Sequence, residues 1–250
     1  MLHAITQKKT SIYQRYLGHR DESEKCVREE DEITSLIMSP LSFLPSRAIG
    51  VFWQRLVSYG KEYKLPVGPV MKAKMHFWPK RKSIEPDMLV ELDWATGERR
   101  RLLIEFKWRA QLSGKDQLYR QWNYFLTETE RDNGCHIFIG PELNAAINAR
   151  SENNIWNGKL LLRSWLQILN VLSELDTDPE GELLIPWAQQ VKTFLELLQI
   201  KPFFGFDRLE HPPLSLYDGR RAFWNAFVGF NHLMLPERIE QNPIFFRLEK

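Results

Sequence analysis

The chain has 250 residues, with 34 Lys and Arg against 32 Asp and Glu, so its formal net charge is only +2. Hydrophobic residues make up 43% of the sequence and charged residues 26%, a balance typical of soluble globular proteins and unlike that of disordered, collagen-like or coiled-coil chains. The near-neutral total also argues against a protein that holds nucleic acid by bulk positive charge, but it leaves room for a local basic patch.

Neither the cysteines nor the hydrophobic pattern points to a secreted or membrane protein. Cys26 and Cys135 lie far apart without CxxC spacing, which indicates reduced thiols rather than a disulfide framework or a zinc site. The N-terminus has no apolar stretch long enough for a signal peptide, and no run of about 18 apolar residues occurs in the chain. We therefore expect a cytoplasmic protein that does not associate with membranes.

The N-terminal quarter of the chain predicts an arm followed by two helices. Residues 1–25 are polar and basic and predict an arm or a weak helix. From Glu29 onward, acidic residues are followed by apolar residues at helical spacing, and Pro40 and Pro45 are expected to break this first helix. A second helix is expected over residues 48–59, ending at Gly60.

The middle of the chain predicts three strands. Residues 70–79 alternate, which puts Val70 on the face that carries lysines and Met71 on the opposite face. Residues 87–94 also alternate, and residues 100–108 follow a Thr96-Gly97 turn. Two strands joined by a short turn with glycine are typical of an antiparallel hairpin.

The remaining elements are expected in a regular order. We predict a helix over 115–129, a short buried strand over 135–141, a strand that runs into a helix over 160–175, a linker over 176–182 and an amphipathic helix over 185–200. This order predicts an α/β or α+β fold with a mixed central sheet flanked by helices. The expected parts are an N-terminal arm (1–27), a core (28–172) and a mostly helical C-terminal extension packed on that core (173–250).

One group of charged residues stands out on the predicted hairpin. Asp87 begins one strand, and Glu105 and Lys107 end the next. The start of the first strand of a hairpin lies beside the end of the second, so Asp87 and Glu105 can meet. Residues two apart share a face of a strand, so Glu105 and Lys107 project together while Phe106 enters the core. Charges at the end of so apolar a strand are more often functional than structural.

The group has the composition of a divalent-metal site. Two carboxylates, here Asp87 and Glu105, together with a backbone carbonyl and water suit Mg²⁺ or Mn²⁺. Such a metal polarises a phosphodiester and lowers the pKa of a bound water. Lys107 would then orient that water or offset the charge that develops on phosphate. The competing interpretation is a cross-strand ion pair on a half-exposed hairpin.

At these residues the sequence resembles the PD-(D/E)XK nuclease superfamily, which has the restriction-endonuclease-like fold. The resemblance rests on Pro86-Asp87 and Glu105-Phe106-Lys107, on adjacent strands after an acidic-headed helix, and covers roughly residues 28–145. It implies that Asp87, Glu105 and the Phe106 carbonyl bind the metal and that Lys107 assists the attacking water.

The resemblance also implies two helical contributions to the site. Members often add a glutamate from the preceding helix; Glu30, Asp31 and Glu32 are the candidates here, and Glu30 is preferred as a further metal ligand because it shares a helical face with Thr34. Many members carry a glutamine on the helix after the lysine strand. Gln117 is preferred for its distance from Lys107, with Gln121 one turn later; a clean QxxxY is absent, because Tyr124 follows Gln121 by three residues.

Other residues are candidates for contact with nucleic acid. A basic rim for a phosphate backbone could be formed by Lys72, Lys74, Lys80, Arg81, Lys82, Arg99 and Arg100, or these could simply be solubilising residues at hairpin ends. Trp108, Trp122 and Tyr119 could stack on bases, although packing in the core is the better interpretation. We interpret His136 as a core residue rather than a metal ligand.

The sequence thus predicts a metal-dependent nuclease that hydrolyses DNA phosphodiester bonds, with Mg²⁺ or Mn²⁺ as cofactor; RNA as substrate is left open. The resemblance implies an endonuclease in prokaryotic defence, restriction or mobile-element processing, acting as a homodimer or with a partner subunit. The alternatives are a non-catalytic nucleic-acid-binding or assembly module on a nuclease-like fold, and an unrelated α+β interaction protein.

Overall fold

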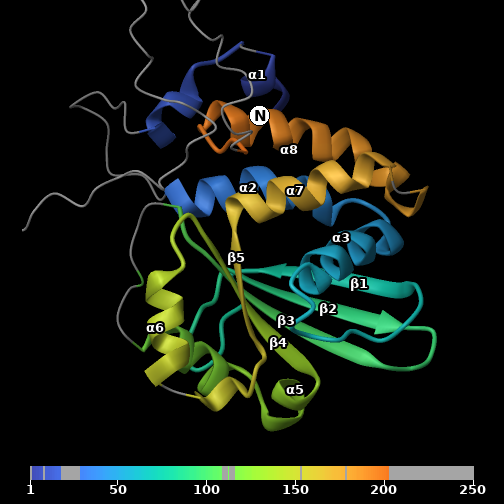
Figure 1. Ribbon diagram of the computed structural model, residues 1–250, viewed down its shortest axis with the longest axis vertical. Helices are drawn as coiled ribbons and strands as arrows, with labels where there is room; N and C mark the ends of the chain where they lie inside the picture. Colours follow the sequence, from blue (N-terminus) through green and yellow to red (C-terminus); the bar gives the residue numbers. More distant parts are fainter. Residues whose placement is uncertain are drawn as a thin grey trace, which may run out of the picture. The chain divides into compact units, whose positions relative to one another are not determined.

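A computed structural model describes residues 2–7, 9–17, 29–108, 112, 116–152, 154–177 and 179–202 (Figure 1). The chain divides into two compact units, Met1–Phe203 and Phe204–Lys250. Both boundaries expected from the sequence, after residues 27 and 172, lie inside the first unit. The helical character expected for residues 203–250 lies outside the described residues, as does Cys26.

The first unit is built on a five-stranded mixed sheet with strand order β1-β2-β3-β4-β5. The strands are β1 (Val70–Phe77), β2 (Met88–Trp94), β3 (Arg99–Phe106), β4 (Gly134–Gly140) and β5 (Leu160–Ser164). Strands β1 to β3 are antiparallel and β3 to β5 are parallel. The predicted hairpin is confirmed: Trp94 and Glu98 pair around the turn, where Gly97 has a φ of 83° that glycine adopts readily.

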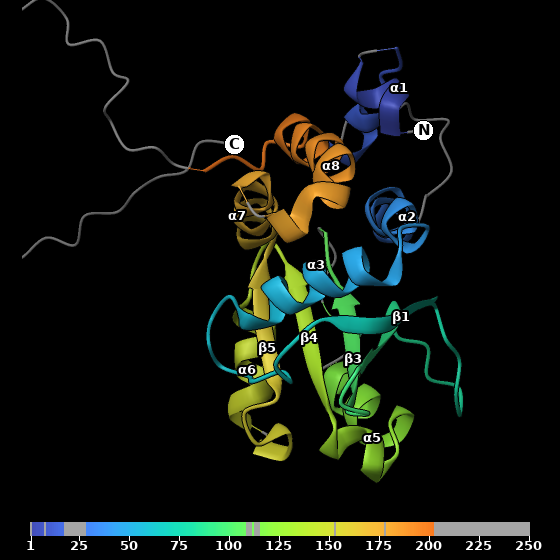
Figure 2. The same ribbon diagram turned by 90° about the vertical axis from the view of Figure 1, so that its right-hand side faces the viewer.

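Helices cover both faces of this sheet, which confirms a mixed α/β fold. Apolar residues of α2 (Glu29–Ser42), α3 (Ser46–Ser58), α7 (Trp165–Glu174) and α8 (Ile185–Leu197) form one core with one face of the strands. Residues of α4 (Gln117–Arg120), η2 (Gln121–Phe125), α6 (Asn144–Glu152) and η3 (Asn154–Trp156) form the other. Figures 1 and 2 show α2, α7 and α8 grouped beyond one end of the sheet, with α3 between that group and the strands.

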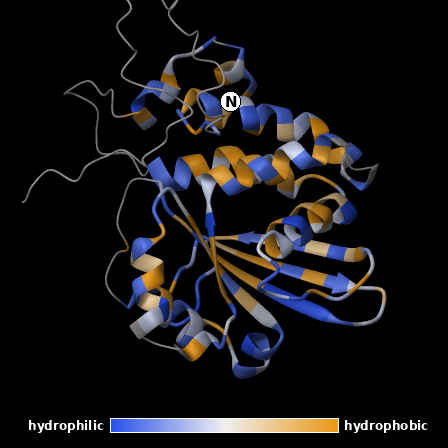
Figure 3. Cartoon of the chain, viewed as in Figure 1, coloured by the Kyte–Doolittle hydropathy of each residue, from blue (hydrophilic) through white to orange (hydrophobic). Residues whose placement is uncertain are grey.

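The distribution of hydropathy explains why the sheet is sandwiched in this way. Figure 3 shows β3 changing from hydrophilic at its Arg99 end to hydrophobic toward the centre of the sheet. Strand β4 is buried along its whole length, as expected for a central parallel strand with helices on both faces. Charged residues are therefore expected only where strands end or where a face is uncovered.

The N-terminal segment is held against α8. It forms α1 (Leu2–Thr6) and η1 (Ile12–Leu17), and Ile5 and Tyr16 are almost fully buried. Tyr16 makes an edge-to-face contact with Phe194, with 6.2 Å between the ring centroids. The described part of the predicted arm therefore packs on the same core as α8.

Two local predictions were wrong for packing reasons. A β-bulge between Val70 and Lys72 shifts the register of β1, so Val70 is buried against Gly50 whereas Met71 is exposed. A Cβ on Gly50 would lie 2.4 Å from the Val70 Cβ, so this close approach of α3 to β1 requires glycine. Pro40, expected to break the first helix, lies inside α2, which ends two residues later.

The single helix predicted over 115–129 is in fact three short elements. Helix α4 runs into the π-helical η2, Leu126 is extended, and Thr127 begins α5 (Glu128–Asp132). Thr127 and Glu130 form a capping box that starts α5. The cap gives the chain a local reason to end one helix and start another, which an unbroken helical pattern does not reveal.

The predicted linker over 176–182 was also wrong. It forms parts of η4 (Leu175–Thr177) and η5 (Pro179–Leu184), and Leu175 and Leu184 are buried in the core shared with α7 and α8. The two leucines that flank the polar stretch anchor it, so it is a packed turn between helices. None of the helices in the described ranges has both the length and the hydrophobicity needed to span a bilayer.

Candidate functional site

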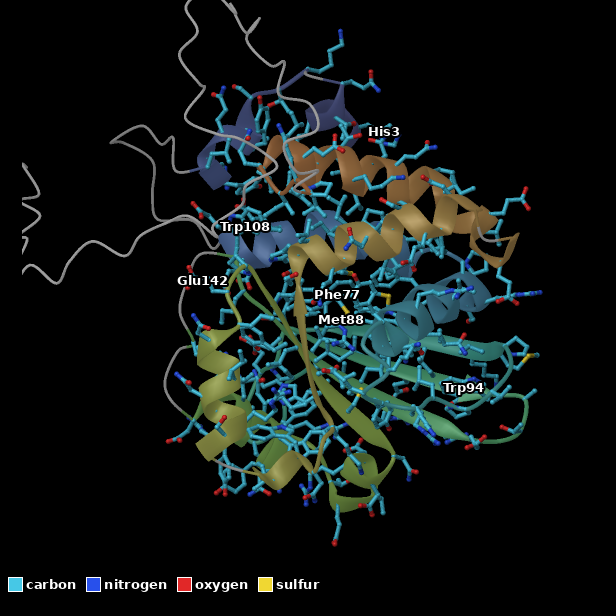
Figure 4. All side chains as sticks on the ribbon, viewed as in Figure 1. His3, Phe77, Met88, Trp94, Trp108 and Glu142 are labelled. Atoms are coloured by element: carbon cyan, nitrogen blue, oxygen red, sulfur yellow. The ribbon has the colours of Figure 1, made fainter. Side chains whose placement is uncertain are left out.

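The candidate site lies where β2 begins and β3 ends. Met88 pairs with Ile104, which puts Asp87 beside Glu105 at the end of the hairpin. The Asp87 Oδ2 accepts a hydrogen bond of 2.7 Å from the Phe106 amide. Figure 4 shows Trp108 and Glu142, which follow β3 and β4, at one edge of the sheet, with Trp94 at the opposite end. The predicted meeting of Asp87 with the Glu105 strand is thus present.

Lys107 joins two elements at this edge. Its Nζ lies 2.9 Å from the Glu105 Oε1 and 2.9 Å from the Glu30 Oε2. Glu105 is 1% exposed and Lys107 7%. The backbone of Lys107 is fixed as well, because its amide donates to the Ile139 carbonyl and its carbonyl accepts from the indole of Trp165. The ammonium is therefore held between the strand carboxylate and the first turn of α2.

The structure distinguishes Glu30 from Glu32 among the three acidic candidates at the start of α2. Glu30 contacts Lys107, in agreement with the preference for this residue. Glu32 instead forms an ion pair with Arg15 and accepts a hydrogen bond of 2.9 Å from the Tyr16 hydroxyl. Glu32 thus links η1 to α2 through Arg15 and Tyr16, outside the Lys107 cluster.

Two glutamines hold the Glu105 carboxylate. The Gln117 Nε2 donates to the Glu105 Oε1 at 2.6 Å, and the Gln121 Nε2 donates to the Glu105 Oε2 at 2.7 Å. They lie on successive turns, Gln117 in α4 and Gln121 in the π-helical η2. Both glutamines considered from the sequence therefore bind the same carboxylate, and the buried member is Gln121, the one that was not preferred.

Behind Gln121 lies a chain of buried hydrogen bonds that ends at Trp156. The Trp156 indole lies 3.2 Å from the His136 Nδ1, and the His136 Nε2 lies 3.2 Å from the Gln121 Oε1. An indole N–H can only donate, so the His136 Nδ1 must accept and its Nε2 must carry the proton. That proton fixes the Gln121 oxygen toward His136 and its amide nitrogen toward Glu105.

His136 is also held by its surroundings in the neutral form. Its ring stacks on Trp122, with 6.1 Å between the centroids and an interplanar angle of 6°. Burial lowers the pKa of His136 to about 3, because a charged imidazolium loses its hydration there. The expectation that His136 is a core residue is correct, but it is a core residue connected to Glu105 through one side chain.

The buried cluster contains more acidic groups than basic ones. Burial, together with repulsion from Glu105 and Glu30, raises the pKa of Asp87 to about 8 against the opposing Phe106 hydrogen bond and Lys107 charge. Burial likewise raises the pKa of Glu30. Burial alone would lower the pKa of Lys107, but the Glu105 and Glu30 carboxylates outweigh it and raise that pKa. Three carboxyl groups thus surround one ammonium, and Asp87 keeps a proton near neutral pH that a bound divalent cation would displace.

The acidic side chains at this edge supply few ligands for a metal ion. No group of three or more His, Cys, Asp or Glu side chains in the described ranges is arranged to hold a metal, so Glu30, Asp87 and Glu105 do not form a three-carboxylate cage. Of the ligands expected from the sequence, Asp87, Glu105 and the Phe106 carbonyl remain candidates, and the Phe106 amide donates to Asp87. Mg²⁺ usually takes one or two carboxylates and keeps several waters.

The seven basic candidates do not form one rim around this site. Lys72 and Lys74 face Asp93 and Glu91 across β1 and β2. Asp93 lies six residues from Asp87 along β2, roughly 20 Å, and Arg99 lies 3.5 Å from Asp93 at that distant end. The next residue, Arg100, projects to the opposite face of β3 and pairs with Glu98.

The other basic candidates lie on the loop between β1 and β2, which leads directly to Asp87. Lys80 lies 3.6 Å from Glu85, and Arg81 is paired with Glu130 at 2.8 Å. Lys82 is exposed and has no ion pair or hydrogen bond with any other residue that the structure describes.

The aromatic candidates differ in how far they are buried. Trp108 and Trp122 are buried, as the core interpretation predicted. Tyr119 is half-buried and makes an edge-to-face contact with Tyr124, which is 50% exposed. Tyr124 was not among the contact residues expected from the sequence, and no role was predicted for Trp156. No short-range pattern marks Trp156, because its contact with His136 spans two elements of the fold.

No protein-family model, no curated protein and no solved structure matches this chain. The geometry and chemistry of the cluster therefore carry the functional argument.

Proposed function

We propose that this chain is a metal-dependent nuclease with a restriction-endonuclease-like core that hydrolyses DNA phosphodiester bonds with Mg²⁺ or Mn²⁺. The observation that carries the proposal is the convergence of Asp87, Glu105 and Lys107 at the buried end of one hairpin, with Lys107 bound to Glu30 of α2. The order of a helix, three antiparallel strands, a helix and a parallel strand supports the fold assignment.

A purely structural ion pair is a poor explanation for this arrangement. Three carboxyl groups surround one lysine, and burial together with repulsion from Glu105 and Glu30 raises the pKa of Asp87. A stability role alone would not favour such an excess, since buried charge without compensation costs free energy. Active sites commonly retain destabilising groups of this kind because function requires them.

Each side chain then has a definite task. Mg²⁺, when bound, would polarise the phosphodiester and generate a nucleophilic water near neutral pH. Asp87 and Glu105 supply carboxylate oxygens, and Gln117 and Gln121 fix the orientation of Glu105. Lys107, anchored by Glu30, is held where an ammonium can orient water or stabilise charge on a phosphate oxygen.

The proposal is tested by incubating the purified full chain with supercoiled and linear DNA in Mg²⁺, Mn²⁺ or EDTA. Asp87→Asn retains an oxygen for the Phe106 amide but removes the charge, and Lys107→Met retains the aliphatic stem. Asp93→Asn, on the same strand as Asp87 but at its far end, is the matched control. We expect metal-dependent cutting by the wild type and Asp93→Asn, and at least about 100-fold slower cutting by the other two variants.

Metal affinity provides a second measurement, by calorimetry with Mn²⁺. If Mn²⁺ binding produces a heat signal with the wild type but not with Asp87→Asn, the result supports the proposed metal site. Binding of DNA without cutting in either metal would favour a non-catalytic binding module instead. The assay should be repeated with the products of neighbouring genes, because we propose that such an enzyme acts as a dimer or with a partner subunit in prokaryotic defence, restriction or mobile-element processing.

A further inference from the structure

A cavity of about 330 Å³ lies between the loop that leads to Asp87 and the segment that follows Gln121. Its volume is at the lower end of the range for small-molecule clefts, roughly 300–1,000 Å³. Among the residues that line it are Arg81, Lys82, Asn123, Tyr124, Thr127 and Arg131. None of these belongs to the carboxylate–lysine cluster, so the cavity is a separate feature of the same region.

The charged residues of the cavity favour an anion. Lys82 and Arg131 line it with a single carboxylate, Glu128, and a third cation, Arg81, is paired with Glu130 at 2.8 Å. Arg81 and Arg131 are fixed, because each donates from Nη1 to backbone carbonyls: Arg81 to Phe125 at 3.4 Å, and Arg131 to Asn123 and Leu126 at 3.0 and 2.8 Å. These carbonyls belong to the π-helical segment and the residue after it, so the arginines stabilise its open backbone.

Lys82 is presented by a strained turn. Arg81 and Ile84 exchange two backbone hydrogen bonds, of 3.0 and 2.9 Å, around Lys82 and Ser83. Both central residues have positive φ, 50° and 64°, as in the type I′ turns in which Asn and Gly are preferred. Neither residue is Asn or Gly, so the turn keeps a lysine at a position that backbone preference disfavours. Such outliers concentrate at functional sites.

Tyr124 supplies an aromatic surface. It is 50% exposed, and its ring contact with Tyr119 is edge-to-face, with 5.9 Å between centroids. An edge contact leaves ring faces for stacking. Tyr124 lies within the π-helical η2 (Gln121–Phe125), a rare form that occurs often at functional sites.

Both walls of the cavity are close in the chain to residues of the proposed active site. Ile84 is three residues from Asp87, roughly 10 Å of extended chain, and Gln121 is three residues before Tyr124. An exposed aromatic ring next to an unpartnered cation is the combination that binds single-stranded nucleic acid without sequence preference. Resting on the proposed nuclease function, we propose that this cavity binds an unpaired nucleotide of the substrate, with its base stacked on Tyr124 and its phosphate near Lys82.

The test is binding of a fluorescein-labelled oligothymidine and of a labelled intact duplex to the full chain in EDTA, measured by anisotropy. EDTA removes any metal-dependent cutting, so binding is measured independently of catalysis. The variants are Tyr124→Ser, Tyr124→Phe and Lys82→Asn; Asn tolerates the positive φ but carries no charge. Phe43→Ser is the matched control, since Phe43 is an exposed aromatic residue elsewhere in the unit.

We expect Tyr124→Ser to weaken binding of the oligothymidine by about 5- to 150-fold, with Tyr124→Phe and Phe43→Ser close to wild type and duplex binding unchanged. Lys82→Asn should reduce the slope of log affinity against log salt by about 0.7. The inference would be overturned if the wild type did not bind the oligothymidine. It would also be overturned if Tyr124→Ser bound the oligothymidine with the same affinity as the wild type.

The outcome is separable from that of the proposed function. Weaker binding of the oligothymidine by Tyr124→Ser, without cutting by the wild type either alone or with the products of neighbouring genes, would keep the nucleotide site and refute the nuclease. Cutting by the wild type, together with unchanged oligothymidine binding by Tyr124→Ser, would support the nuclease and refute the nucleotide site. Equal weakening of single-strand and duplex binding would show that Tyr124 contributes to general affinity, and would also overturn an unpaired nucleotide as the ligand.

Discussion

At the scale of single residues, the pKa of Asp87 links stability to the proposed metal site. Burial and repulsion from Glu105 and Glu30 raise this pKa to about 8, whereas an Asp in an unfolded chain titrates near 3.9. The folded protein therefore keeps a proton on Asp87 that the unfolded chain releases. This contribution to stability is fully present below about pH 4 and is lost as the pH rises through about 8.

Asp87→Asn should stabilise the metal-free protein at high pH, because Asn cannot ionise and can still accept from the Phe106 amide. We expect no difference from wild type below about pH 4, and a free energy of unfolding at least about 1.4 kcal/mol higher at pH 8, the equivalent of one pKa unit. Urea denaturation of both proteins across this pH range measures the difference in the free energy of unfolding. Saturating Mg²⁺ should stabilise wild type, by about 2.7 kcal/mol at 100 times the Kd, and leave the variant unchanged. A variant less stable than wild type at pH 8 in EDTA would contradict the assignment.

The hydrogen bonds from Trp156 to Glu105 give a second prediction at this scale. Trp156→Phe removes the only donor that the described residues offer to the His136 Nδ1, so His136 should lose its single tautomer and Gln121 its fixed orientation. We expect a loss of about 1–3 kcal/mol in the free energy of unfolding, together with weaker Mn²⁺ binding. Nitrogen chemical shifts of His136 report the tautomer directly.

Trp187→Phe is the control for this variant. The Trp187 indole donates to the Ile37 carbonyl at 2.8 Å, buried and away from Glu105. Trp187→Phe should lower the free energy of unfolding by a similar amount, whereas the His136 tautomer and the Mn²⁺ affinity should stay as in wild type. Equal loss of Mn²⁺ affinity in both variants would mean that the chain of hydrogen bonds merely stabilises the fold.

At the scale of elements, the end of α3 depends on a residue of β5. Arg163, 1% exposed, donates to the carbonyls of Leu56 and Val57 at 3.0 Å each and to the Glu62 carboxylate at 2.8 Å. These carbonyls belong to the last turn of the helix, where no intrahelical donor follows and a cation is favoured by the helix dipole. The guanidinium thus fastens α3 to the sheet from within the core.

Arg163→Met should therefore destabilise the fold by about 3 kcal/mol or more, because it leaves buried carbonyls without donors. Glu62→Gln is the comparison: Glu62 is 43% exposed on its side chain, and this change should cost less than about 1 kcal/mol. Urea denaturation of both variants checks the prediction. Similar costs would mean that the ion pair, and not the capping of α3, is the stabilising contact.

At the scale of the whole molecule, the division after Phe203 makes a prediction about folding. The sheet, both cores and the candidate site lie within Met1–Phe203. A chain ending at residue 203 should unfold in a single thermal transition, within about 4 °C of the full chain, which corresponds to roughly 1 kcal/mol at this size. Calorimetry measures it. A truncated chain without a cooperative transition would show that residues 204–250 supply necessary contacts.

Much of the fold could be predicted because its signals are local. The Thr96-Gly97 turn and the alternation on both sides define the hairpin over a short stretch of chain, and the two-residue period puts Glu105 and Lys107 on one face. The Ser164 cap likewise marks the change from β5 to α7. The helix over 115–129 was predicted in one piece, because hydrophobic spacing does not register a π-helical turn; the Thr127–Glu130 capping box is the local signal that marks the start of α5.

The sequence by itself determined the hairpin, the mixed α/β order of elements and the meeting of Asp87 with the Glu105 strand, since each follows from turn chemistry and strand period. Only the tertiary structure decided which acidic residue of α2 meets Lys107, because Arg15 and Tyr16 engage Glu32. It also decided that Val70 is buried, that His136 is joined to Glu105, and that the basic residues are dispersed. These depend on contacts between elements distant in the chain, whose geometry no local pattern records.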